Sequence, residues 1–162
     1  MARDVSFLQY MRAHGNTAGP TQRPLLTGAI GGLIAFVPYE LILNYSGAGE
    51  AIAHGVGLNG GVSIGVGALL MIFAGVLYAA VFKRAANDRR GGWLFGASYG
   101  FLLWIITPIT LWQAITARPL VVGRAAMGLF GAHVLFGVIL GAIFPWVHRF
   151  VQTRMNHGEK TQ

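Results

Sequence analysis

The chain has 162 residues, of which 54% are hydrophobic and only 10% charged. It contains no cysteine, which excludes disulfides, thiolate metal sites and a cysteine nucleophile. The net charge of +7 would suggest nucleic-acid binding in a soluble protein, but no exposed aromatic or polar partners accompany the basic residues, so we expect no nucleic-acid partner.

Residues 1–24 form a polar and basic N-terminal segment. Within it, residues 4–13 fit either a short helix at the membrane interface or a frayed end. No apolar signal-peptide core precedes Leu25, so we expect no cleaved leader.

Four apolar stretches follow, at residues 25–45, 62–82, 92–113 and 121–147. Each reaches the ~20 apolar residues that a helix needs to cross a bilayer. The second and third carry no charged side chain, whereas a soluble helix of this length would show a polar face. The sequence therefore predicts an all-α, polytopic membrane protein with four transmembrane helices at 25–147, followed by a tail at 148–162.

The basic residues predict the orientation. Ten of the twelve precede the first span, separate the second from the third or follow the fourth, and only Arg118 and Arg124 lie on the other side. The positive-inside rule then places both termini in the cytoplasm, and we expect a multi-pass protein of a bacterial inner membrane.

The spans also suggest an internal repeat. Residues 75–82 align with 137–144, and residues 28–32 align with 96–100. Equivalent spans run in the same direction, so the pattern indicates either a parallel tandem repeat of two helical hairpins or chance similarity between apolar sequences.

Every span contains two small residues four positions apart, a spacing that lets two membrane helices approach closely. These predicted packing pairs are Gly28/Gly32, Gly61/Gly65, Gly96/Gly100 and Gly137/Gly141.

Glu40 is the one acidic residue inside an apolar run, in the outer part of the first span. An unpaired carboxylate at such depth is costly, and Arg124 lies at a comparable depth in the fourth span. We expect an ion pair that locks the two spans; a proton relay, a small polar ligand site or a carboxylate that reaches water are the alternatives. The polar cluster predicted around this pair consists of Glu40, Asn44, Gln113 and Arg124, with Thr107 and Thr110 nearby.

His133 lies near the middle of the fourth span and is the one residue considered for cofactor binding. No other span contains a histidine, which argues against a bis-histidine haem within the chain. A hydrogen bond to a carbonyl, Ser98 or Thr107 is the favoured role, while a haem or quinone between subunits stays open. We predict no cofactor, no metal and no catalytic residue, because no nucleotide, phosphate, zinc-protease or nucleophile motif is present.

Two segments of the second half carry a family resemblance: Leu94–Trp104 (LFGASYGFLLW), with a proline soon after, and His133–Gly141 (HVLFGVILG). They resemble a group of uncharacterised bacterial four-span membrane proteins that includes the YagU-like ones. The resemblance implies the four-span architecture and supplies no reaction. Such relatives often have a histidine in the second span, where this chain has Met71.

The leading functional hypothesis is a non-catalytic accessory or scaffold subunit. It would pack by glycine-rich helix faces into a larger inner-membrane complex, such as a respiratory or other energy-transducing one. The alternatives are a small oligomeric transporter or channel that uses the Glu/Arg/Asn cluster, and a haem- or quinone-binding subunit. The expected partners are the lipid bilayer and other membrane subunits or further copies of the chain.

Overall fold

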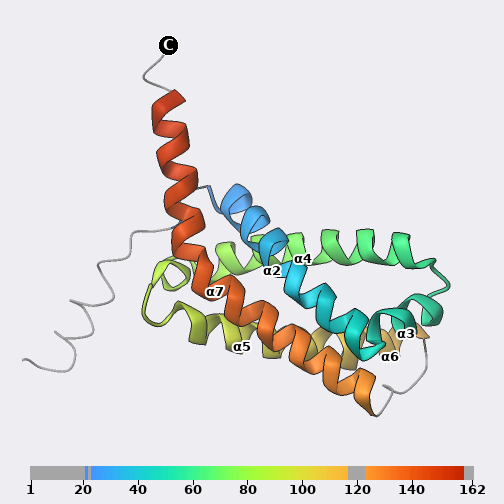
Figure 1. The fold of residues 1–162 in the computed structure, drawn as a ribbon. Helices are drawn as coiled ribbons and strands as arrows, with labels where there is room; N and C mark the ends of the chain where they lie inside the picture. The colour runs from blue at the N-terminus through green and yellow to red at the C-terminus, as the bar shows by residue number, and fades with distance from the viewer. Residues whose placement is uncertain (1–20, 22, 117–122, 159–162) are drawn as a thin grey trace, which may run out of the picture.

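The computed structural model describes residues 21, 23–116 and 123–158, without the side chains of residues 115 and 155–158. The segment 4–13 and the end of the predicted tail lie outside these residues. The described part is helical and contains no strand (Figure 1). Its elements are α2 (Pro24–Ser46), α3 (Ala48–Gly55), α4 (Gly60–Phe82), η1 (Ala85–Asn87), α5 (Gly92–Trp104), η2 (Ile105–Leu111), α6 (Trp112–Thr116) and α7 (Arg124–Gly158).

Four helices are long and apolar enough to cross a membrane: Pro24–Ser46, Gly60–Phe82, Gly92–Ala114 and Arg124–Arg154. These match the four predicted spans, and the prediction of an all-α polytopic membrane protein is confirmed. Helix is the expected conformation, because a chain in lipid must satisfy its backbone hydrogen bonds within each segment.

The predicted outer joint between the first two spans is mostly ordered structure. Gly47 ends α2 in a left-handed conformation, with φ of 76°, and its N–H donates to the Asn44 carbonyl at 3.2 Å. Glycine adopts this conformation without a steric penalty, so the chain turns at once into α3. Asn59 then caps α4, and its side-chain oxygen accepts the Val62 N–H at 2.9 Å.

The third span is not a uniform α-helix, because η2 is a π-helical segment that contains Pro108. Proline has no N–H to donate and interrupts the α-helical pattern. In a π-helix the hydrogen bonds join residues five positions apart. The Trp112 N–H accordingly donates to the Thr107 carbonyl, and the Thr110 hydroxyl donates to the Ile105 carbonyl at 3.0 Å. Such π-helical segments frequently occur at functional sites.

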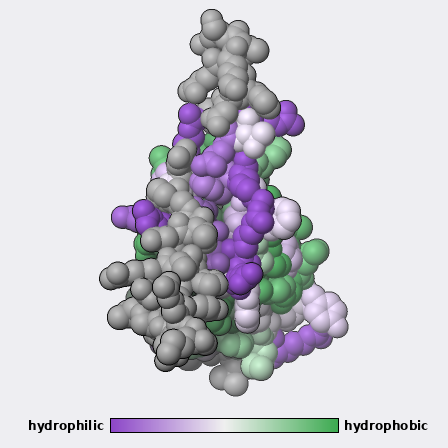
Figure 2. Space-filling view, turned by 90° about the vertical axis from the view of Figure 1, so that its left-hand side faces the viewer, coloured by the Kyte–Doolittle hydropathy of each residue, from purple (hydrophilic) through white to green (hydrophobic). Residues whose placement is uncertain are grey.

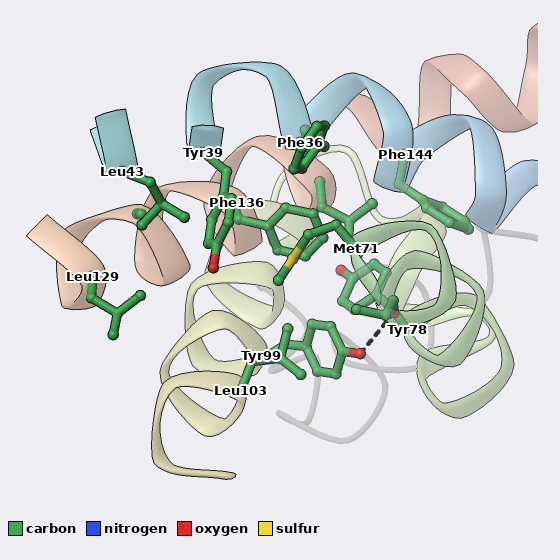
Figure 3. Close-up of a cluster of buried hydrophobic side chains, with 14 of the residues drawn as sticks. Phe36, Tyr39, Leu43, Met71, Tyr78, Tyr99, Leu103, Leu129, Phe136 and Phe144 are labelled. Atoms are coloured by element: carbon green, nitrogen blue, oxygen red, sulfur yellow. Dashed lines mark hydrogen bonds between the residues drawn. The ribbon is translucent and has the colours of Figure 1, made fainter. Parts of the chain in front are cut away.

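The spans are arranged in the order α4, α2, α7, α5, since α2 packs against α4 and α7, and α7 packs against α5. Side chains complete the contact between α4 and α5: the Tyr99 hydroxyl donates to the Ala74 carbonyl at 2.7 Å, and the Tyr78 and Tyr99 rings lie 5.3 Å apart. Figure 3 shows these aromatic side chains with Met71 and Phe136 inside the bundle.

Two glycine-mediated crossings hold the helices together. A Cβ atom added to Gly28 on α2 would lie 2.5 Å from the Gly75 carbonyl oxygen on α4. In the second crossing, a Cβ on Gly96 of α5 would collide with the Gly137 carbonyl of α7. Only glycine permits such backbone contact, and van der Waals contact is what drives helix association in lipid.

The two crossings repeat the same contacts, in the register of the predicted alignment. A Cβ on Gly32 would meet the Met71 carbonyl, and one on the equivalent Gly100 would meet the His133 carbonyl. The repeat does not extend to the whole bundle: α2 packs along α7, whereas the equivalent helices α5 and α4 share no comparable backbone contact.

Helix α7 continues well past the predicted end of the fourth span at residue 147. It runs without a break from Arg124 to Gly158, which is 35 residues or about 52 Å of helix. The hydrocarbon core of a bilayer is about 30 Å thick, so one end of α7 projects beyond it. The first part of the predicted tail is therefore helical.

Candidate functional site

His133 lies at the centre of the bundle and is 2% exposed. Its Nδ1 atom is 2.8 Å from the carbonyl oxygen of Leu129, one turn earlier on α7. Its Nε2 atom is 3.0 Å from the hydroxyl oxygen of Thr107 on η2. The edge of the Tyr39 ring on α2 packs against the imidazole, with ring centroids 5.1 Å apart. Of the alternative partners predicted for His133, a carbonyl and Thr107 are found, whereas the Ser98 hydroxyl donates to the Leu94 carbonyl.

The hydrogen-bond partners determine which ring nitrogen of His133 carries the hydrogen. A carbonyl oxygen only accepts, so Nδ1 carries the hydrogen toward Leu129. In a neutral ring Nε2 then accepts from the Thr107 hydroxyl. That hydroxyl also lies 2.7 Å from the Leu103 carbonyl, so its one hydrogen is shared between two acceptors. The network joins α7 to the π-helical segment of the third span.

This arrangement occupies both ring nitrogens of His133. A histidine that binds haem iron needs one nitrogen free to face the metal, and here Nε2 faces Thr107 instead. Within the described part of the chain, no group of three or more His, Cys, Asp or Glu side chains is placed to hold a metal ion. The geometry of His133 favours a role in helix packing.

The expected ion pair between Glu40 and Arg124 is not formed. Glu40 Oε1 accepts a hydrogen bond from the Asn44 side chain at 3.2 Å, one turn along the same helix. Arg124 Nη2 donates to the Tyr45 carbonyl at 2.9 Å, and its guanidinium stacks on the Tyr45 ring at 4.8 Å. That prediction is wrong.

The reason is the direction of the arginine side chain. Arg124 is the first residue of α7, and side chains on a helix tilt toward its N-terminus. The guanidinium therefore extends outward to Tyr45, five residues and about 7.5 Å of helical rise beyond Glu40. Of the predicted polar cluster, Glu40 and Asn44 meet on α2, while Gln113 lies exposed on α6 with no hydrogen bond seen in the described residues.

The four glycine pairs differ in whether another helix of the chain contacts them, which their identical spacing did not reveal. Three of the four pairs lie in the crossings described above. The remaining pair, Gly61 and Gly65, lies in the N-terminal half of α4. An added Cβ on Gly65 would have no atom within 4 Å, and one on Gly61 would meet only its neighbour Asn59, at 3.7 Å. This half of α4 extends away from α2 and α5 in Figure 1.

Most residues in the N-terminal half of α4 are exposed, although Gly67 lies against the Phe36 ring and Ala68 packs against the core. Val62 and Ile64 lie about 200° apart around the helix, and they are 47% and 42% exposed. No residue from Gly60 to Leu70 is buried. Over its spanning window α4 is the most hydropathic of the four helices, and 28% of that window is buried, compared with 44% for α7 and 22% for the third span. We call residues 60–70 the open half of α4.

The chain matches no known family model, no curated protein and no solved structure at a significant level. The likeness to the YagU-like group stays a prediction. The four apolar helices identify a multi-pass membrane protein whose environment is the lipid bilayer.

Proposed function

We propose that this protein is a non-catalytic subunit of a larger membrane assembly, and that it binds a transmembrane helix of a partner subunit through the open half of α4. The membrane would be a bacterial inner membrane with both termini in the cytoplasm, as the distribution of basic residues favours.

The observation that carries this proposal is the unequal use of the glycine pairs. The pairs on α2, α5 and α7 are filled by backbone from a neighbouring helix of the same chain. Gly61 and Gly65 have the same spacing but no neighbour. A helix surrounded only by lipid gains nothing from glycine, which lowers helix stability by about 1 kcal/mol per residue relative to alanine. A pair of glycines four positions apart on an uncovered helix surface is expected where another helix packs.

The interior supports a structural role. Two buried hydrogen bonds join different helices of the bundle: His133 bonds to Thr107, and Tyr99 donates to the carbonyl of Ala74. Aromatic and glycine contacts fill the remaining space, which makes the bundle a rigid support for a docked helix.

The experiment is the extraction of the tagged protein from native membranes with a mild detergent, followed by a native gel and mass spectrometry. Stoichiometric co-purification of a larger membrane protein is the expected result. The variant Gly61→Leu/Gly65→Leu should lose that partner while keeping its own fold, because leucine fills the space between the two helices. A homogeneous oligomer of this chain alone would refute the accessory role.

The chain offers a matched control. Gly131 on α7 also has no atom within 4 Å of an added Cβ, but no second glycine of a small-residue pair lies four positions from it. Gly131→Leu should therefore leave the partner bound. Equal loss of the partner in Gly131→Leu and in the α4 variant would contradict the assignment of the interface to α4.

A small oligomeric transporter or channel is the second candidate, supported by the environment of Glu40. Its carboxylate bonds to Asn44 yet stays partly exposed at the side of α2. In an oligomer this polar pair could line a path between subunits. Glu40→Gln would then abolish flux without changing the assembly, whereas no loss of flux would eliminate this candidate.

A further inference from the structure

At the end of the bundle opposite the open half of α4, two arginines from different elements share one tryptophan. The Arg89 guanidinium, in the joint before α5, lies 5.8 Å from the centre of the Trp146 ring on α7. The Arg149 guanidinium, on α7 itself, lies 4.8 Å from a ring of the same indole. We call Arg89, Trp146 and Arg149 the arginine–indole cluster.

The cluster is held in place by backbone contacts. A Cβ on Gly92 would lie 2.8 Å from the Gly141 carbonyl, so the start of α5 is fixed against α7 next to Arg89. Arg149 Nε donates to the Pro145 carbonyl at 3.2 Å, which orients the guanidinium and leaves its terminal nitrogens for another acceptor. The arrangement is a built site, not two freely moving side chains.

The charge of the cluster is not neutralised within the described part of the chain, where neither arginine pairs with a carboxylate. Among the described residues, the acidic residue next to the cluster in the chain is Asp88, and its Oδ1 accepts the backbone N–H of Arg90 at 2.9 Å. Figure 2 shows hydrophilic side chains gathered on one face of the molecule. By their place in the chain, five further exposed basic residues belong to the same end of the bundle: Arg23, Lys83, Arg84, Arg90 and Arg154.

Apolar surface lies directly beside these charges. Trp146 is 66% exposed, Phe150 is 58% exposed and Trp93, in the first turn of α5, is 50% exposed. Exposed tryptophans of membrane proteins sit at the level of the lipid headgroups. The guanidinium groups next to Trp146 are therefore at the level of the lipid phosphates, while the apolar surface faces the acyl chains.

We propose that the arginine–indole cluster binds the phosphate of an anionic phospholipid. Arginine recognises phosphate with two parallel N–H···O bonds, and stacking on an indole leaves those N–H edges free to point outward. Two such groups on either side of one ring can hold a single headgroup phosphate, with the acyl chains against the exposed apolar side chains.

The test is native mass spectrometry of the full-length protein in an uncharged detergent, titrated with phosphatidylglycerol or phosphatidylcholine. The wild type should bind phosphatidylglycerol more tightly. A hydrogen bond from a guanidinium in direct contact with the phosphate contributes about 1 kcal/mol, or about a fivefold effect, so Arg89→Gln/Arg149→Gln should bind phosphatidylglycerol ~25-fold more weakly. An unchanged preference in this variant would overturn the proposal.

Arg154→Gln is the matched control, because it removes the same charge from the same end. Arg154 stacks on Phe150 at 5.5 Å, outside the cluster, so its loss should change binding by less than about twofold. If Arg154→Gln lost as much affinity for phosphatidylglycerol as each arginine of the cluster does, binding would depend on the general positive charge of this end, and a defined site would be refuted.

Two further measurements distinguish a lipid site from a folding defect and from a site for a soluble anion. Arg89→Gln alone touches no hydrogen bond seen in the structure and should retain the wild-type melting temperature, with a loss of about fivefold in phosphatidylglycerol binding. Competition with inorganic phosphate should displace little lipid; full displacement at millimolar phosphate would assign the cluster to a soluble anion and overturn the lipid proposal.

Discussion

The substitution Gly28→Ala tests the helix crossings most directly. The added Cβ would lie 2.5 Å from the Gly75 carbonyl oxygen and 2.6 Å from the Val76 Cα. Ordinary van der Waals contact begins at 3.4 Å, so α2 and α4 must separate by 0.9 Å, the difference between 3.4 and 2.5 Å. Both obstructing atoms belong to the backbone, and no side-chain rotation relieves the contact.

The expected cost follows from that separation. Overpacking a well-packed interior destabilises by about 1–3 kcal/mol, and a backbone obstruction belongs at the upper end of this range. Alanine recovers about 1 kcal/mol through its higher helix propensity. The net loss is about 1–2 kcal/mol, or a melting temperature lower by about 2–8 °C for a chain of this length.

The assay is thermal unfolding of the purified monomer in detergent, followed by circular dichroism. Gly65→Ala is the control: an added Cβ meets nothing within 4 Å, so the substitution should leave the melting temperature unchanged or raise it by up to about 4 °C. Equal destabilisation by both substitutions would refute the reasoning. So would a neutral Gly28→Ala, because the crossing would then not be limited by backbone contact.

Three more experiments test the polar contacts. Thr107→Val removes the hydroxyl that bonds to His133 and should lower the free energy of unfolding by about 1–2 kcal/mol. Thr107→Ser keeps the hydroxyl and should retain most of the wild-type stability. If Thr107→Val were as stable as the wild type, the buried imidazole would have another partner. A double-mutant cycle of Glu40→Gln with Arg124→Gln should give a coupling energy within about 0.5 kcal/mol of zero, because the two side chains bond to different groups. A larger coupling energy would indicate that the two side chains form an ion pair after all. Tyr99→Phe should cost about 1 kcal/mol by removing the 2.7 Å hydrogen bond to α4, with no change in the lipid preference measured by mass spectrometry.

The architecture could be predicted because the bilayer imposes it. A stretch of about twenty apolar residues must form a helix in lipid, so the positions of the apolar stretches predicted all four spans. For α2 and α4 the predicted ends lie within a few residues of the observed ones. The alignment of Gly75 with Gly137 predicted a repeat, and both glycines lie in equivalent crossings, but the sequence did not indicate which helices would cross.

The side-chain partners were harder to predict, because depth in the membrane does not give direction. Glu40 and Arg124 were predicted at a comparable depth, but the N-terminal tilt of the arginine side chain carries it to Tyr45. Pro108 is visible in the sequence, but the π-helical register around it, from which Thr107 bonds to His133, is not. Likewise, four identical glycine spacings gave no sign that one pair would remain open.

The packing of α2 along α7 has a consequence for how the chain is made. These are the first and last of the four spans, and Tyr39 on α2 meets His133 and Phe136 on α7. Residues 47–123 must be synthesised before α7 begins, which takes on the order of 4–15 s at 5–20 residues per second. During this time the inner face of α2 has lipid or a membrane insertase as its neighbour. The core of this protein is thus completed last, and a chain truncated before residue 124 would enter the membrane with three helices but without the helix that joins α2 to α5.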